Sequence, residues 1–452
     1  MDWTEPLFTS DEMKRAEAGH DVPTLMARAG AAVAEEALRW FPERHSFAVV
    51  CGGGANGGDG RIAAERLRDA GREATVVDVK AGDDLPAADV VVDALFGTGF
   101  SGEPRSEAAR LIEAMNGAGA PVVAVDLPSG VDASTGEVAG AAVLAAVTVT
   151  FHGPKVGLAV APGRFHAGEV VVTDIGLERS DTQNALITRD VLRLIPPKRH
   201  EDNKYTAGSV LVVGGSPGLT GAACLAVEAA FRADAGYVAV AAPPESLPIL
   251  ETRLLEAVKR PLDEVFEAAG RAGALAIGPG LGRSQERQAL VRRLLEETDL
   301  PAVVDADGLF ELGPFERSAP TVLTPHEGEL GRLLGREGSW VARHRLAAAR
   351  EAASRFRSIV LLKGADTIIA RPGSDGVLVQ PGDTPALATA GTGDVLTGVI
   401  AAFLAKRMEP MAAAAAGAAA HELAATLAGR PAGLIASDVV AALPDAVLPW
   451  AR

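Results

Sequence analysis

One short segment joins glycines to a single carboxylate directly before an apolar helical pattern: Thr389-Ala390-Gly391-Thr392-Gly393-Asp394. Its small residues let several backbone N–H groups crowd together, and Val395, Val399 and Phe403 follow at helical spacing. A glycine-rich turn that opens a helix binds anions, because its free N–H groups and the helix dipole point the same way. Asp394 could therefore accept a proton from a hydroxyl while these N–H groups hold a transferring phosphoryl group.

Three loops in the first half of the chain, 52–60, 93–103 and 126–132, also pair glycines with Asp, Asn or Ser. One such loop is weak evidence, since turns need glycine in any case. Each of the three follows a β-branched run, and loops after parallel strands meet at the carboxyl edge of a sheet. Together they predict one crevice with N–H donors for phosphates and oxygen ligands for a cation.

Each of these residues also has a purely structural alternative. Asp394 could favour the start of a helix through its charge alone. Asp93 and Asp126 could end strands and cap the helices that follow. His152 and Lys155 are interpreted as loop or packing residues.

The elements that must position these loops show a regular alternation of short β-branched runs with helical stretches, after two helices expected within 10–40. Such alternation predicts parallel sheets with helices on both faces, and hence two doubly wound α/β domains. A polar stretch with Pro196-Pro197, within 176–206, predicts a linker and domains 1–195 and 196–452. The predicted strands are 47–51, 74–79, 90–95, 122–127, 147–151, 170–175, 210–213, 237–241, 274–277, 302–304, 321–323, 359–362 and 367–370.

Length and composition agree with a multidomain enzyme of ordinary globular type. The 452 residues predict roughly two to four domains. A formal net charge of −16 argues against a nucleic-acid partner or an anionic membrane surface. Cys51 and Cys224 form neither a disulfide framework nor a zinc pattern. With no leader and no apolar run of about 20 residues, we expect a cytoplasmic protein, and its alanine-rich helices favour a homo-oligomer.

Residues 1 to about 195 resemble the Rossmann-like epimerase domain of bifunctional NAD(P)H-hydrate repair enzymes. The resemblance rests on Asn56-Gly57-Gly58-Asp59-Gly60 and on segments 93–103 and 126–132. It implies a catalytic Asp126 and a K⁺ site made by Asn56, Asp93 and Ser129, whose oxygens suit a hard cation. It further implies that the hydrated dinucleotide contacts Ala55, Asn56, Gly57, Gly58, Asp59, Gly97, Thr98, Gly99, Phe100, Ser101, Gly102, Glu103 and Asp126.

Residues from about 204 to 443 resemble the ADP- or ATP-dependent NAD(P)H-hydrate dehydratase domain, which is ribokinase-like. The resemblance rests on the Gly391–Asp394 turn and on segments 305–308, 324–329 and 363–367. It implies that Asp394 is the catalytic base. The implied substrate contacts are Ala222, Gly280, His326 and Asp394, and the implied nucleotide contacts are Lys363, Gly364, Ala365, Asp366, Thr367, Gly391, Thr392 and Gly393. By itself His326 is typical of a satisfied loop histidine.

The resemblance implies an enzyme that interconverts the R and S epimers of hydrated NADH or NADPH. It then dehydrates the S epimer at the expense of ADP or ATP, through a phosphorylated intermediate, with Mg²⁺ for the dehydratase and K⁺ for the epimerase. The alternative is a small-molecule kinase of the vitamin or sugar class. Its N-terminal half would then be a non-catalytic ligand-binding module.

Overall fold

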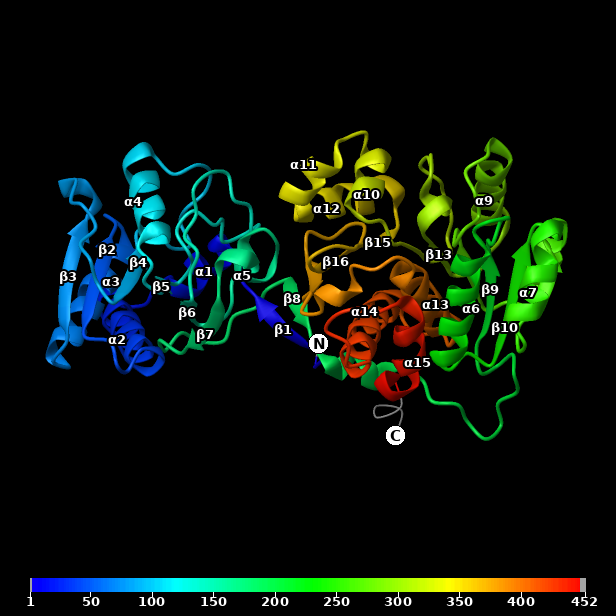
Figure 1. Cartoon of the computed structure of the whole chain (residues 1–452), viewed down its shortest axis with the longest axis horizontal. Coiled ribbons are helices and arrows are strands. Elements are labelled where there is room, and N and C mark those ends of the chain that lie inside the picture. Colours follow the sequence, from blue (N-terminus) through cyan, green and yellow to red (C-terminus); the bar gives the residue numbers. More distant parts are fainter. Residues whose placement is uncertain (1, 448–452) are drawn as a thin grey trace. The chain divides into compact units, whose positions relative to one another are not determined.

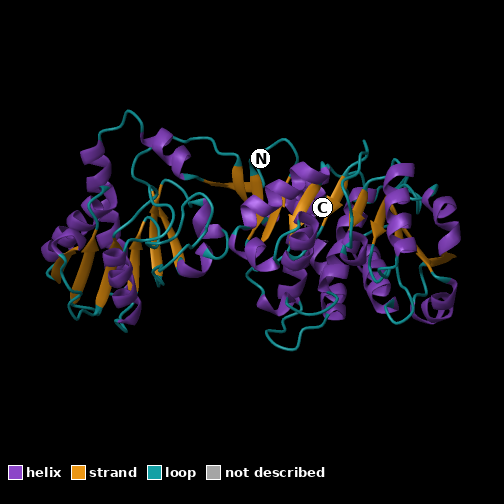
Figure 2. Ribbon diagram, turned by 90° about the horizontal axis from the view of Figure 1, so that it is seen from above, coloured by secondary structure: helices purple, strands orange, loops and turns teal. Residues whose placement is uncertain are grey.

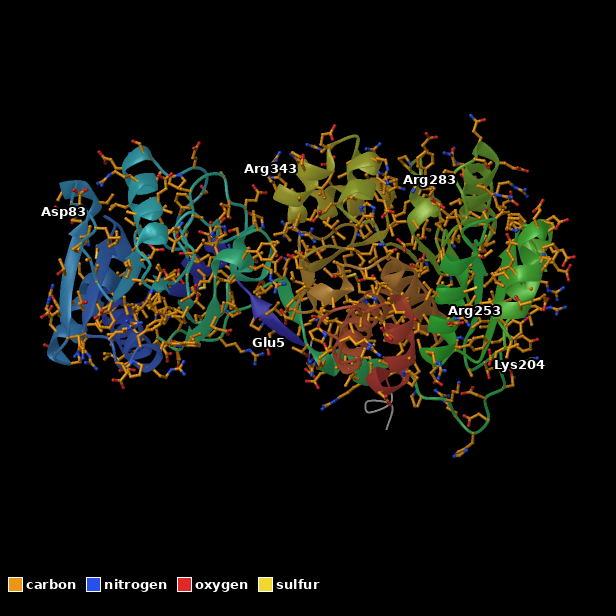
Figure 3. The ribbon with its side chains drawn as sticks, viewed as in Figure 1. Glu5, Asp83, Lys204, Arg253, Arg283 and Arg343 are labelled. Atoms are coloured by element: carbon orange, nitrogen blue, oxygen red, sulfur yellow. The ribbon has the colours of Figure 1, made fainter. Side chains whose placement is uncertain are left out.

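The computed structural model describes residues 2–447, and the chain forms two compact units. We call Pro6–Ala185 the N-terminal unit, and Leu186–Arg452 with Met1–Glu5 the C-terminal unit. Each unit has a sheet with helices against it, as Figure 1 and Figure 2 show. Charged side chains such as Asp83 and Arg253 lie on the outside of their units (Figure 3).

The N-terminal unit contains a six-stranded, wholly parallel sheet in the order β3-β2-β4-β5-β6-β7. Its strands are β2 (Ser46–Cys51), β3 (Glu73–Asp78), β4 (Val90–Ala94), β5 (Val122–Val125), β6 (Val147–Phe151) and β7 (Glu169–Thr173). Its helices are α1 (Ser10–Glu17), α2 (Val22–Trp40), α3 (Ala55–Asp69), α4 (Ser106–Gly117) and α5 (Val156–Ala159), with 3₁₀ turns η1 (Val79–Ala81) and η2 (Gly163–His166).

Side chains that alternate along β2 divide the core of this unit into two layers. Phe47, Val49 and Cys51 pack with α2 and α3 on one face, while Val50 packs with α4 on the other. Cys51 is fully buried, as expected of a small hydrophobe. A Cβ at Gly60 would collide with Ala94 of β4, so this glycine lets α3 approach the sheet closely.

The C-terminal unit contains most of an 11-stranded sheet in the order β1-β8-β17-β16-β15-β14-β13-β12-β9-β10-β11. Its strands are β1 (Thr4–Leu7), β8 (Asn184–Ile187), β9 (Ser209–Val213), β10 (Tyr237–Ala242), β11 (Val258–Pro261), β12 (Ala274–Ile277), β13 (Ala302–Val304), β14 (Thr321–Leu323), β15 (Ile359–Leu362), β16 (Thr367–Ala370) and β17 (Val377–Gln380).

The helices of this unit carry the Asp394 turn and the loops around it. They are α6 (Thr220–Arg232), α7 (Leu247–Arg253), α8 (Val265–Ala269), α9 (Gln285–Glu297), α10 (Glu327–Leu334), α11 (Gly338–Arg343), α12 (Arg345–Phe356), α13 (Thr392–Ala405), α14 (Pro410–Leu427) and α15 (Ala436–Val447). The 3₁₀ turns are η3 (Arg189–Leu194), η4 (Pro244–Ser246), η5 (Leu262–Glu264), η6 (Ala306–Leu309) and η7 (Pro385–Leu387). None of the helices in residues 2–447 combines the length and apolar character that a membrane crossing requires.

The predicted fold class is confirmed, and each predicted strand lies on an observed one within a few residues. The parallel pattern ends at β15, because β15–β16 and β16–β17 pair antiparallel. Strands β1, β8, β11 and β17 were not predicted; β1 and β11 contain proline and charged residues, which are unfavourable signals for a strand. Within the predicted linker, β8 and η3 form over 184–194.

Each sheet has a point where the order of its strands reverses, and this is where α/β folds bind ligands. In the N-terminal unit, β2 lies between β3 and β4, so the loops after β2 and β4 flank the reversal. In the C-terminal unit, β9 lies between β10 and β12. The glycine-rich segments 52–60 and 95–103 in one unit, and 214–221 and 278–282 in the other, follow these strands; the predicted loop 52–60 is helical from Ala55, where α3 begins.

Candidate active sites

A cavity of about 660 Å³ lies at the reversal point of the N-terminal unit. Residues of α1 and α2 line it, and its polar groups come from α1, from α3 and from the segments after β4, β5 and β6. It collects most of the predicted contact residues: Ala55, Asn56, Asp59, Gly97, Thr98, Gly99, Phe100, Ser101 and Asp126. Gly57, Gly58, Gly102 and Glu103 do not line it. A Cβ at Gly57 would collide with the carbonyl of Gly52, so Gly57 serves the close turn from β2 into α3.

Asp126 is held in this cavity in a strained conformation. Its φ of 66° lies in the left-handed region, which costs a non-glycine residue energy and is concentrated at functional sites. Its carboxylate accepts hydrogen bonds from Thr150 Oγ1 at 3.1 Å and from the backbone N–H of Thr98 at 3.3 Å. Lys155 Nζ lies 2.6 Å from its Oδ1, and the Lys155 side chain is fully buried.

Lys155 is therefore an ion-pair partner of Asp126 and not only a loop or packing residue, as the sequence alone suggests. Its ammonium also donates to Thr150 Oγ1 and to the carbonyl of Phe151, both at 2.8 Å. A buried cation needs such a complete set of partners. No local pattern in the sequence pairs Lys155 with Asp126, and only the packing of the segment after β6 against the end of β5 does so.

Two more carboxylates line the same cavity, Asp59 on α3 and Glu17 on α1. Asp59 is 9% exposed, and its carboxyl group has no hydrogen-bond or ion-pair partner among residues 2–447. Burial, with the charges of Asp126 and Glu17, raises the pKa of Asp59 to about 8. Burial and the charge of Asp126 also raise the pKa of Glu17. Sequence reasoning missed Glu17, which belongs to no recognisable motif.

Asn56, Asp93 and Ser129 come together beside this cavity. Ser129 donates to Asp93 twice, from its backbone N–H at 2.8 Å and from its hydroxyl at 2.7 Å. Asp93 is fully buried, and burial raises its pKa to about 6. The side chain of Asn56 faces Gly97, and its buried Nδ2 has no partner among the described residues. Since amide O and N are assigned from their surroundings, this orphaned end suits a carbonyl oxygen that faces a cation.

In the C-terminal unit the Asp394 turn has the predicted form. Gly391 is the N-cap of α13 with a φ of 90°, a conformation that favours glycine, and Asp394 lies in the first turn. Thr392 Oγ1 donates to the carbonyls of Leu387 and Thr389 at 2.9 Å, which holds the turn on the preceding loop. The N–H of Thr392 donates to the carbonyl of Thr389 at 3.4 Å, and the N–H groups of Gly393 and Asp394 follow it in the first turn of α13, where a helix can bind an anion.

A buried ion pair stands beside Asp394. Lys363 Nζ, after β15, lies 2.6 Å from Asp305 Oδ1, after β13. The other oxygen of Asp305 accepts a hydrogen bond of 2.7 Å from Thr397, one turn beyond Asp394. Burial and the charge of Asp305 raise the pKa of Asp394 to about 7. A carboxylate poised near neutrality is suited to take a proton from a hydroxyl.

Asp305 and Thr397 were not among the predicted site residues. The segment 305–308 was noted for its resemblance, but nothing in the sequence assigned it a contact. Thr397 looks like any polar residue within a helix. Its hydroxyl is fully buried against Asp305, which is 92 residues away in the chain, and only the fold shows this pairing.

Hydrogen bonds join the loops at the reversal point of the C-terminal unit. Ser216 donates from its N–H to the carbonyl of Gly280 at 2.7 Å and from its hydroxyl to that of Leu281 at 2.6 Å. Asp307 accepts from the N–H of Gly282 at 2.9 Å and from Arg283 Nε at 2.7 Å. Arg283 is labelled in Figure 3. The bonds from Ser216 thus hold the backbone of Gly280 and Leu281. Ala222, the other predicted substrate contact here, lies in the first turn of α6.

His326 and the 363–367 loop are joined through one arginine. His326 caps α10, where its Nδ1 accepts from the N–H of Gly328 at 3.0 Å and its own N–H donates to Glu329 at 2.9 Å. Next to it, Glu327 pairs with Arg345. Arg345 also donates to the side chain and to the carbonyl of Asp366, both at 2.8 Å. The arginine is 2% exposed and thereby links the two predicted binding loops.

Each α/β unit has a set of carboxylates beyond the carboxyl ends of its strands, and this arrangement is typical of enzymes that handle nucleotide-like ligands. Comparison with known proteins agrees with this class. Residues 210–444 match the NAD(P)H-hydrate dehydratase family, and residues 22–87 and 78–157 match the family of the YjeF-related protein N-terminus.

Similar proteins extend over nearly the whole chain. The bifunctional NAD(P)H-hydrate repair enzyme Nnr of Moorella thermoacetica is 36% identical over 508 residues, which cover 97% of this chain and 96% of that protein. The Escherichia coli protein of the same name is 32% identical over 487 residues, 98% of this chain and 94% of that protein. The ADP/ATP-dependent NAD(P)H-hydrate dehydratase of Bacillus subtilis, co-crystallised with ATP/Mg²⁺, is 31% identical with a TM-score of 0.54, and the likeness covers 58% of this chain and 97% of that one. The chain belongs to the family of bifunctional NAD(P)H-hydrate repair enzymes, as its loops predicted.

Proposed function

We propose that this chain repairs hydrated NADH and NADPH, the C-terminal unit acting as an ADP- or ATP-dependent dehydratase and the N-terminal unit as an epimerase. The observation that carries the proposal is the Asp394 site. A carboxylate with a pKa of about 7 lies in the first turn of α13, beside the Lys363–Asp305 pair. This is the arrangement that phosphorylation of a hydroxyl needs.

The residues support a two-stage dehydration. Hydroxide is a poor leaving group, so the ring hydroxyl is first phosphorylated. Asp394 takes the proton of this hydroxyl while the hydroxyl oxygen attacks the terminal phosphorus of the nucleotide. The P–O bond between that phosphorus and the rest of the nucleotide breaks. The N–H groups of Gly391–Gly393 stabilise charge on the transferred group. Phosphate then departs with the C–O electrons, and loss of a proton from the neighbouring carbon restores the ring double bond.

The acidic surroundings of Asp394 fit a nucleotide that arrives with Mg²⁺. Asp305, Asp307 and Glu329 act on Asp394 as negative charges, and Lys363 is the cation that offsets them. Free ADP or ATP would add further negative charge, which Mg²⁺ on the phosphates offsets when bound. The residues that would face the metal are Asp394 and Asp305. Lys363 and the 363–367 loop would contact the nucleotide itself.

For the N-terminal unit we propose that hydrated NADH or NADPH occupies the cavity at Asp126, with K⁺ held by Asn56, Asp93 and Ser129. Asp93 supports this assignment, because burial raises its pKa and an adjacent cation would keep it ionised. We expect K⁺, but not Na⁺, to raise the unfolding temperature of the wild-type protein, and Asp93→Asn to remove this effect. Equal stabilisation by K⁺ in both proteins would contradict the assignment.

Asp394→Asn tests the dehydratase. A mixture of both epimers is incubated with Mg²⁺, K⁺ and ADP or ATP, and the recovery of reduced-nicotinamide absorbance is followed. We expect the variant to lose roughly 10²–10⁴-fold in rate. Asp438→Asn is the matched control, because Asp438 also lies in the first turn of a helix, α15. If Asp394 only favours its helix, the two variants will behave alike and the base assignment fails.

The wild-type result also decides the remaining alternatives. Accumulation of a phosphorylated alcohol would indicate the small-molecule kinase, which near full-length similarity to bifunctional relatives does not favour. Recovery that stops after one epimer would indicate an N-terminal unit that only binds ligand. Functional domains 1–195 and 196–452, a cytoplasmic location and a homo-oligomer remain part of the proposal. Light scattering of the purified chain tests the last of these.

A further inference from the structure

Among the described residues, three carboxylates line the cavity of the N-terminal unit, but only one buried lysine does. Glu17, Asp59 and Asp126 line it, and the lysines that line it are Lys155 and Lys14. Lys14 is exposed, where it pairs with Asp11 at 3.3 Å. Lys155 is therefore the only one of these lysines buried among the carboxylates.

Lys155 has no donor left for Asp59. An ammonium has three N–H groups, and those of Lys155 are directed at Asp126 Oδ1, Thr150 Oγ1 and the carbonyl of Phe151. Asp126 thus receives a full counter-charge. Asp59 is only 9% exposed and lines the cavity. Its carboxyl group has no hydrogen-bond or ion-pair partner among residues 2–447.

Two of the carboxylates in this cavity have different surroundings. Asp126 forms an ion pair with the buried Lys155, whereas burial and the charges of Asp126 and Glu17 raise the pKa of Asp59 to about 8. Two carboxyl groups whose surroundings differ in this way can serve as acid and base. Asp59 lies on α3, three residues beyond Asn56, and the proposed K⁺ ligand Asp93 lies on β4 and is not among the residues that line the cavity.

We propose that Asp59 is a second catalytic residue of the epimerase, acting as the acid opposite Asp126, with Lys155 as the residue that positions Asp126. This proposal rests on the proposed epimerase function. Water added to the ring places a hydroxyl on a carbon beside nitrogen. When Asp59 gives its proton to that oxygen, the C–O bond breaks, water leaves, and the nitrogen lone pair forms a C=N⁺ bond.

Inversion follows when water adds to the opposite face of the same carbon. The new C–O bond forms as the C=N⁺ electrons return to nitrogen, and Asp126 takes the surplus proton. No oxidant or further reactant is needed. The reverse epimerisation uses the same two groups in exchanged roles, and proton exchange with solvent resets them between turnovers.

Asp59→Asn in the full-length chain is the direct test, since it keeps the size and polarity of the side chain but cannot supply a proton. With both epimers, nucleotide, Mg²⁺ and K⁺, recovery of the reduced nicotinamide has a fast phase from the S epimer and a slow phase from the R epimer. We expect the kcat of the slow phase to fall roughly 10²–10⁴-fold. The KM should change little, since an amide keeps the contact. A slow phase at the wild-type rate would overturn the proposal.

The pH profile adds a measurement that a merely structural role would not move. The groups that face Asp59 are Glu17 and Lys14 from α1, Asp126 after β5 and Lys155 before α5. Asp59 acts in its protonated form, so kcat/KM for epimerisation should fall as pH rises through about 8. Asp59→Asn should lack this decline.

Glu17→Gln provides a second, independent variant. It removes a negative charge that raises the pKa of Asp59, so the alkaline decline should move to lower pH while the maximal rate remains measurable. An unmoved decline, or a decline that persists in Asp59→Asn, would overturn the proposal even if one variant were unstable. A wild-type chain whose slow phase equals the enzyme-free rate would instead show that the proposed epimerase function itself is wrong.

Discussion

Replacing Arg345 with methionine is the perturbation whose magnitude the structure defines best. The Arg345 side chain is 1% exposed and the Asp366 side chain 0%, and their atoms meet at 2.8 Å. Removing one partner of a buried ion pair typically costs about 3–5 kcal/mol, because the remaining charge stays buried without its counter-ion. We therefore expect the free energy of unfolding of the C-terminal unit to fall by about 3–5 kcal/mol.

The same change should weaken nucleotide binding. Arg345 holds the 363–367 loop through both the side chain and the carbonyl of Asp366, and it ties this loop to Glu327 beside His326. Loss of the anchor lets the loop move, so part of the binding energy must be used to order it. Urea unfolding with and without ADP or ATP measures both effects on one protein.

Arg357→Met is the matched control. Arg357 and Glu316 also form an ion pair, at 2.9 Å, but their side chains are 72% and 83% exposed. Exposed pairs contribute about 0–1 kcal/mol. If Arg345→Met destabilises the protein no more than Arg357→Met does, the inference that the buried pair holds the loop is refuted.

Further expectations concern the Asp394 site. Asp394 must be ionised to accept a proton and its pKa is raised to about 7, so kcat/KM for dehydration should rise with pH up to about 7 and then level off; a flat profile from acidic to neutral pH would contradict this. Thr397→Val removes the 2.7 Å hydrogen bond to Asp305 and should destabilise the C-terminal unit by about 1.5–3 kcal/mol, whereas Thr397→Ser should restore it; equal urea midpoints for the two variants would refute the bond's role. Gly391→Ala forces a side chain to a φ of 90° and against Leu225, which should cost at least about 1–2 kcal/mol and slow dehydration; a variant as stable and active as the wild type would show that the turn tolerates a Cβ.

The sequence by itself determined the two α/β units and the loops that carry the chemistry. Alternation of β-branched runs with helical stretches is a local signal, and the strands it predicts are observed, including β2, β4 and β9. Glycines at 391 and 57 indicate tight turns, because glycine adopts a left-handed φ without strain and allows a close approach of backbones. Strands β1 and β11 are missed because proline and charged residues interrupt their β-branched pattern.

Tertiary structure alone decided which side chains meet at those turns. Lys363 reaches Asp305 across 58 residues of sequence and Thr397 reaches it across 92, because β14 alone separates β15 from β13 in the sheet and α13 packs against β13. Lys155 meets Asp126 because β6 lies beside β5. Such contacts depend on strand order and register, which the packing of the whole unit fixes. The protonation states of Asp59 and Asp394 follow from burial and neighbouring charges, so they too belong to the folded protein rather than to any local sequence pattern.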